Sequence, residues 1–122
     1  MFLITTAWNF VIENQSGKYN YDFIFKQHMI TGSRSLYINN KRVYKKKMMI
    51  RLIGNINFTL KHNNIPLLNS NNDYYYVCIH MESRYQIQKR THSSQKFKYI
   101  QHHLFVNGQK LIPGDNNPNK IS

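Results

Sequence analysis

Apolar side chains at every second position constrain this chain most. In the segment YNYDFIF, residues 19–25, every second residue is aromatic. Successive side chains of a β-strand point to opposite faces, so this spacing places the four rings on one face. The same period of two recurs at residues 6–13, 55–60 and 84–88, whereas helical periodicity is almost absent. The pattern predicts β-strands.

Turn signals separate the predicted strands. Residues 14–17, ending in a glycine, predict a four-residue loop that joins the first two strands as a hairpin. Asn39-Asn40 predicts a two-residue hairpin turn, because Asn tolerates left-handed backbone geometry. Asn107-Gly108, between the runs HLFV and QKLI, is the strongest short hairpin signal in the chain.

The other segments complete the expected strand order. Residues 48–53, MMIRLI, predict a strand buried on most of its surface. Residues 74–81 form the strongest apolar run, and residues 82–83 are expected to turn it into the next strand. The polar segments 61–73 and 113–122 are expected to be loops, the first with a short edge strand at its proline.

Composition agrees with an all-β fold. The chain has 122 residues, of which 41% are hydrophobic and 14% aromatic, so it is too apolar for a disordered segment. About eight short strands with short turns predict an antiparallel β-sandwich with little or no helix; a barrel is the alternative. No run approaches the roughly eighteen apolar residues of a membrane span, and no signal peptide is evident. We therefore expect a cytoplasmic protein.

Few residues suggest catalytic or metal chemistry. None of the six histidines has zinc-site spacing, and we expect them at surface or loop positions, with His102 and His103 on opposite faces of one strand. Cys78 and His80 share a strand face, but a cysteine in such a strand is usually a small hydrophobic residue. No phosphate-binding or catalytic motif occurs. We predict no enzyme activity, cofactor, metal or small-molecule substrate.

Positive charge is the other distinctive property of the sequence. Seventeen Lys and Arg residues against five Asp and Glu give a net charge of +12. Basic and aromatic residues alternate in KRVYKKK and FKYIQ, as in barrels that bind single-stranded nucleic acid. Lysine on the solvent side of a sheet also discourages aggregation, and we favour that interpretation. The candidate basic contact surface consists of Arg42, Lys45, Lys46 and Lys47.

A longer pattern spans about residues 8–88. An early Trp8 is followed by TGSR, residues 31–34, by the Asn39-Asn40 hairpin and by MMIRLIGNINF. This pattern resembles the Fas apoptotic inhibitory molecule family, in which S-G-K-R-x-V-x-V-[DN]-G-x-E precedes W-M-F-x-L-V-G-x-E-x-F. The structural positions shared with the family pattern are Trp8, Gly32, Arg34, Met49, Leu52, Gly54 and Phe58. The chain departs from the pattern at Gln27, Asn40, Met48 and Ser83, which replace His, Gly, Trp and Gly.

The resemblance implies a domain organisation and a function. The family has two tandem β-sandwich domains, so residues 1–90 are expected to form the first and residues 91–96 a linker. Residues 97–122 are expected to be an incomplete hairpin of the second domain, where HLFVNGQKL resembles V-W-x-N-G-K-x-L, followed by a flexible tail. The implied function is non-enzymatic: inhibition of death-receptor (Fas)-mediated apoptosis through protein partners in apoptotic or survival signalling, with protection against protein aggregation. The alternatives are a basic β-domain that binds single-stranded nucleic acid or other polyanions, and a truncated, non-functional family member.

Overall fold

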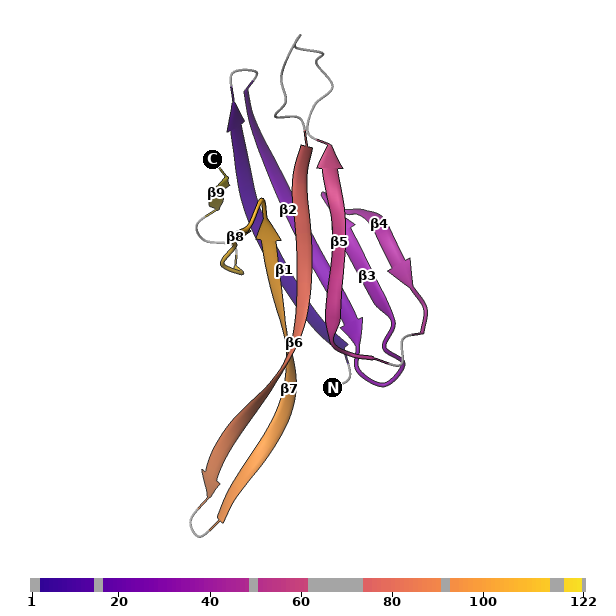
Figure 1. Cartoon of the computed structure of the whole chain (residues 1–122), viewed down its shortest axis with the longest axis vertical. Coiled ribbons are helices and arrows are strands. Elements are labelled where there is room, and N and C mark those ends of the chain that lie inside the picture. The colour runs from indigo at the N-terminus through magenta and orange to yellow at the C-terminus, as the bar shows by residue number, and fades with distance from the viewer. Residues whose placement is uncertain are drawn as a thin grey trace.

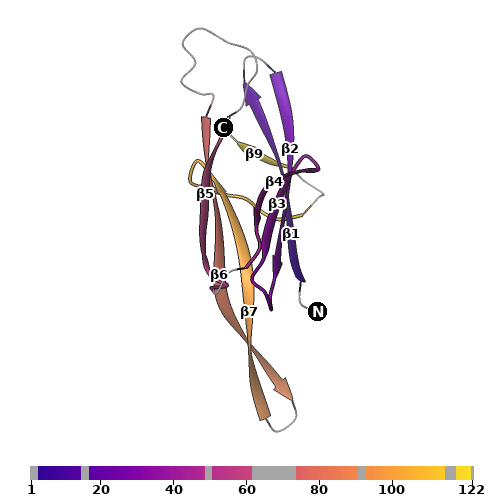
Figure 2. The same ribbon diagram turned by 90° about the vertical axis from the view of Figure 1, so that its right-hand side faces the viewer.

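The computed structural model describes residues 3–14, 17–48, 51–61, 74–90, 93–114 and 118–121. These residues form nine strands and no helix, in two sheets that pack against each other (Figures 1 and 2). The predicted all-β sandwich is confirmed. The strands are β1 (Leu3–Asn14), β2 (Gly17–His28), β3 (Arg34–Ile38), β4 (Lys41–Lys46), β5 (Gly54–Lys61), β6 (Tyr74–Arg90), β7 (Ser93–Val106), β8 (Gln109–Lys110) and β9 (Asn119–Ile121).

The first sheet has the strand order β4-β3-β2-β1-β9. The predicted hairpins β1–β2 and β3–β4 are both present and antiparallel. β9 pairs with β1 in parallel, and Ile121 is buried in the core. The expectation of a flexible tail is therefore wrong for residues 119–121, because an apolar side chain there packs between the sheets.

The second sheet has the order β5-β6-β7-β8. β6 continues through Glu82 and Ser83, which pair with Gln101 and Ile100 of β7. The predicted turn at residues 82–83 is wrong, because a long partner strand extends the ladder through these polar residues. The far half of the β6–β7 hairpin extends beyond the sandwich as a two-stranded ribbon (Figure 1).

The buried strand predicted at residues 48–53 is wrong for the part of this segment that is described. Residues 48 and 51–53 lie outside every strand, and Met48 is 78% exposed. The chain passes here from β4 in the first sheet to β5 in the second, and residues 48 and 51–53 pair with none of the described strands. Residues 49–50, and the loop expected at 62–73, lie outside the described residues.

The hydrophobic core lies between the two sheets. Phe10 and Phe23 meet edge to face with ring centroids 5.1 Å apart. Ile79 and Leu104 of the second sheet belong to the same buried cluster. Each fully buried side chain of this size stabilises the fold by roughly 1.5–3 kcal/mol. Core residues from the stretch that was expected to be a second-domain fragment are Ile100, Leu104, Val106, Leu111 and Ile121. Residues 93–96, expected in a linker, begin β7.

Candidate interaction site

The candidate basic surface lies along one edge of the first sheet. Arg42, Lys45 and Lys46 belong to β4, the edge strand, and Lys47 follows directly after it. All four side chains are exposed. The sequence KRVYKK therefore places its cations on an edge strand. There they stay solvated, which discourages pairing with another sheet, and they are accessible to acidic groups.

An apolar groove lies beside this basic edge. It has a volume of about 350 Å³ and runs between β3 and β4 on one side and β5 on the other. β4 and β5 are the edge strands of their respective sheets and lie on the same, open side of the sandwich (Figure 2). The residues that line the groove come from these strands and β3, so the groove lies on that side. Its lining residues are Leu36, Ile38, Val43, Tyr44, Ile56, Asn57, Phe58, Thr59 and Leu60.

Four of the family-pattern positions support the core or the strand beside the groove. Trp8 is fully buried, and its indole Nε1 has no hydrogen-bond partner among the described residues. Phe58 stacks on Phe23 with ring centroids 6.4 Å apart, and Leu52 packs against the same core. Gly54 begins β5 with φ +139°, a conformation that L side chains rarely adopt.

Of the other family-pattern positions, Gly32 lies in the turn before β3, and Arg34 begins β3 and contacts the segment that connects the two sheets. Gly32 has φ +73° in the turn after β2, and its N–H donates to the carbonyl of His28 at 2.8 Å. Buried Arg34 donates from Nη2 to the carbonyl of Arg51 at 2.6 Å. Arg34 thereby fixes the connection between β4 and β5 to the start of β3. Met49 lies outside the described residues.

A chain of buried and partly buried hydrogen bonds joins the two sheets. His102 on β7 contacts Thr6 Oγ1 through Nδ1 at 2.9 Å and Gln27 Oε1 through Nε2 at 2.7 Å. An amide oxygen only accepts, so His102 Nε2 carries the proton and Nδ1 accepts from the Thr6 hydroxyl. Gln27 continues the chain of hydrogen bonds, because its Nε2 donates to the carbonyl of Leu52 at 2.9 Å.

His102 is held neutral by this environment. Burial, and then the positive charge of Arg34 and the neighbouring His103, lower the pKa of His102 from 6.5 to about 4. The expectation of a surface histidine is wrong for both, since His102 is 4% and His103 5% exposed. The period-two pattern of Ile100, His102 and Leu104 was the signal that places His102 on the apolar face.

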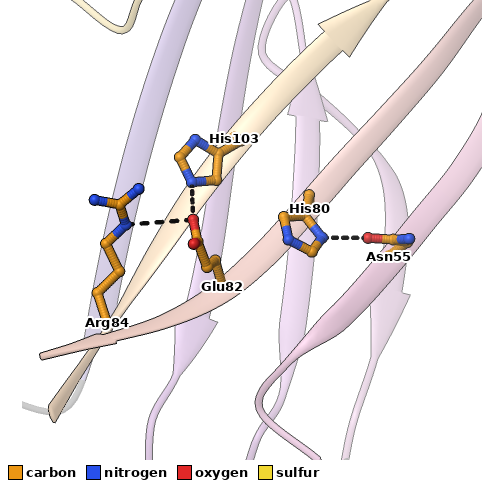
Figure 3. Close-up of polar contacts among 5 residues, drawn as sticks. All are labelled: Asn55, His80, Glu82, Arg84 and His103. Carbon is orange, nitrogen blue, oxygen red and sulfur yellow. Dashed lines mark hydrogen bonds and ion pairs between the residues drawn. The ribbon is translucent and has the colours of Figure 1, made fainter.

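His103 lies on the opposite face of the second sheet, as predicted. Its Nε2 donates to the Glu82 carboxylate at 2.7 Å, and Arg84 Nε lies 3.4 Å from the same oxygen (Figure 3). The hydrogen bond from His103, together with Arg84, holds the pKa of the Glu82 carboxyl below its ordinary value. His80 stacks on His103 with ring centroids 6.0 Å apart and bonds through Nδ1 to Asn55 Oδ1.

The outer face of the second sheet lacks an activated nucleophile in the part of the chain that is described. Burial raises the pKa of the Cys78 thiol, which disfavours the reactive thiolate. The nearby His80 has its Nδ1 engaged by Asn55. Within the described ranges, no three His, Cys, Asp or Glu side chains gather closely enough to hold a metal ion.

These features define a class: a small basic β-sandwich with an apolar groove on its open side. The family model for Fas apoptotic inhibitory molecule matches residues 4–77, which is more than half of the chain. The chain therefore belongs to the Fas apoptotic inhibitory molecule family. No curated protein and no solved structure matches its sequence. The described part of the chain contains no helix that is long and apolar enough to cross a membrane.

Proposed function

We propose that this chain is a non-enzymatic, cytoplasmic regulator that opposes death-receptor-triggered apoptosis by binding a protein partner. Membership of the Fas apoptotic inhibitory molecule family is the observation that carries this proposal. The family match runs from β1 into β6 and contains every groove residue. The same regulator is proposed to limit protein aggregation, as the family resemblance implies.

The groove gives the protein–protein contact a physical basis. Val43 is 50% exposed although it is apolar, and it lines the groove beside the cations of β4. Interfaces commonly have an apolar centre and a polar rim, and this arrangement has both. A substrate pocket would instead need converging catalytic groups, which the described residues of the groove do not provide.

A cell-survival assay tests the proposal. Cells that express the chain and cells that carry an empty vector are exposed to a death-receptor agonist, and survival is measured at matched expression. We expect the chain to increase survival and Val43→Glu to abolish the increase, because a buried carboxylate at the contact is costly. Ile112→Glu is the matched control, since Ile112 is 75% exposed and lies outside the groove. Equal survival with the folded wild-type chain and the empty vector would contradict the proposal.

Polyanion binding is the second candidate function, favoured by the exposure of Arg42 and Lys45–Lys47 on one edge. Fluorescence anisotropy with a labelled single-stranded oligonucleotide tests it. Specific binding should persist above about 0.2 M salt, whereas loss below that concentration indicates only the general electrostatic attraction of a basic protein. No binding at low salt would exclude this function.

A further inference from the structure

The edge strand β5 lacks the features that usually prevent a sheet edge from pairing. It aligns with β6 residue for residue, from Gly54 opposite Met81 to Lys61 opposite Tyr74, without a bulge. Among the described strands, none pairs with its other side. Between Gly54 and Lys61 the strand has no charged residue and no proline. β5 therefore presents a straight row of backbone donors and acceptors.

The edge strand β4, across the groove, is protected in two ways. Its register with β3 shifts, so that Arg42 lies opposite Tyr37 and Tyr44 opposite Leu36, which leaves Val43 as an extra residue. Such a bulge, together with lysines along the strand, opposes the addition of another strand. Of the two edges that border the groove, β5 is the one suited to strand pairing.

The charged residues in the segment from β4 through β5, which borders the groove, are all positive. The segment from β4 through β5 contains no Asp or Glu, and all its described Lys and Arg residues are exposed. A partner with negative charge is thus attracted, and one with positive charge is repelled. The cations of this segment are Lys41, Arg42, Lys45, Lys46, Lys47, Arg51 and Lys61.

The groove supplies apolar contacts for a strand lying along β5. Ile56, Phe58 and Leu60 alternate along β5 and line the groove floor. A strand added to β5 would direct every second side chain toward this floor. Apolar residues at those positions would be buried, and the intervening positions would remain free for charged residues.

We propose that β5 and the adjoining groove bind an extended acidic segment of a partner protein, in which acidic and apolar residues alternate, by strand addition. This inference rests on the proposed function and names the partner chemistry and the site. A second copy of the chain is disfavoured as occupant, because two chains of net charge +12 repel each other.

Peptide binding tests the inference independently of cell survival. We would measure fluorescence anisotropy with a labelled peptide of eight residues, the length of β5, in which Glu alternates with Val. Peptides with Lys for Glu, or Ser for Val, are the controls for charge and apolar contact. We expect binding of the Glu–Val peptide at least about tenfold tighter than either control. Equal affinity for the Lys–Val peptide would overturn the proposal.

Amide methylation tests strand pairing itself. A strand added to β5 bonds through alternate amides, so N-methylation of one alternate set should abolish binding and methylation of the other set should preserve it. Hydrogen exchange should show new protection at β5 amides. Binding that survives both methylation patterns, or protection confined to other strands, would exclude strand addition at β5.

Matched lysine variants separate local from general charge effects. Lys45→Ala/Lys46→Ala removes two cations from β4, and Lys110→Ala/Lys120→Ala removes two exposed cations from β8 and β9. We expect about a fivefold loss of affinity for the first pair and little change for the second. Equal losses would mean that only net charge matters and would contradict the proposal.

Two further results distinguish this inference from the function on which it rests. A dimer found by sedimentation, with hydrogen-exchange protection at the β5 amides, would identify a second copy as the occupant. That result would overturn the inference. Protection of cells without peptide binding would defeat the inference alone. Peptide binding at β5 without protection of cells would support the site and contradict the proposed function.

Discussion

The hairpins β3–β4 and β7–β8 lie in different sheets but end in the same kind of turn. Asn39 and Asn40 have φ of 49° and 68°, and Asn107 and Gly108 have φ of 49° and 78°. Two successive left-handed residues form the turn that matches the twist of the flanking strands. The two turns are therefore alike in backbone geometry, although only one contains a glycine.

The asparagine at the first position of each turn also attaches its hairpin to a third strand. Asn39 Oδ1 accepts from the Asp22 N–H of β2 at 2.8 Å. Asn107 Oδ1 accepts from the Tyr76 N–H of β6, also at 2.8 Å. In both hairpins one side chain therefore belongs to the turn and also pairs a backbone N–H of the neighbouring strand.

The buried polar residues of the two hairpins differ. β3 carries Arg34, a buried cationic side chain. β7 carries His102, which is neutral in the folded protein. The two hairpins should therefore respond differently to acid, even though their turns are equivalent.

Acidification should produce the largest effect. The pKa of His102 is 6.5 when unfolded and about 4 when folded, so the unfolded chain gains the proton first. This contribution to stability is complete above pH 6.5 and is lost as the pH falls toward 4. We expect a loss of about 2 kcal/mol by about pH 5 in chemical denaturation. His102→Gln should remove this part of the pH dependence; an unchanged dependence in that variant would assign it to other groups.

Removing the turn asparagines should produce the next largest effect. Asn107→Ala loses a hydrogen bond to Tyr76 and places Ala at positive φ, so we expect about 1.5 kcal/mol of destabilisation. Asn39→Ala should cost a similar amount, because Asn39 Oδ1 accepts from the Asp22 N–H at the same distance as Asn107 Oδ1 accepts from Tyr76. Denaturant unfolding of both variants measures this, and costs that differ by more than about 1 kcal/mol would break the equivalence of the turns.

Gly108→Ala should have a smaller effect. A Cβ at Gly108 meets no atom within 4 Å, so the cost comes from the backbone conformation at φ +78° rather than from a clash. We expect about 1 kcal/mol of destabilisation by thermal or denaturant unfolding. Unchanged stability would show that the backbone relaxes at this turn.

Exchanging the second turn residues should have the smallest effect. Asn40→Gly should stabilise the chain by about 0.5 kcal/mol, since Gly adopts φ of +68° with less strain than Asn. Gly108→Asn should destabilise it by about the same amount. The double exchange should then restore the original unfolding midpoint; a large residual difference would mean that the two turns are not interchangeable.

Local sequence patterns predicted much of the strand content. The alternation in residues 19–25 and the asparagine turns report backbone geometry within a few residues, and all of these elements form as expected. The turn expected at residues 82–83 fails because Glu82 and Ser83 have strand partners in β7, Gln101 and Ile100. Composition alone does not reveal such a partner.

The candidate interaction site was only partly predictable. The sequence identifies the cations of β4 as a charged run, and their charge needs no tertiary structure. The groove, by contrast, combines side chains from β3, β4 and β5, and it exists only because β4 and β5 end their sheets on the same side. A linear pattern does not indicate which strands will be edges.

The sequence by itself determined that this chain forms strands, where two of its hairpins turn, and that its surface is basic, because these properties follow from neighbouring residues and from composition. Only the tertiary structure decided which histidine is buried and which strand edge is open. His102 meets Gln27 and Thr6 across 75 and 96 residues of sequence, and its neutral state results from the burial and charge that this packing imposes. The packing of one sheet on the other supplies that long-range information.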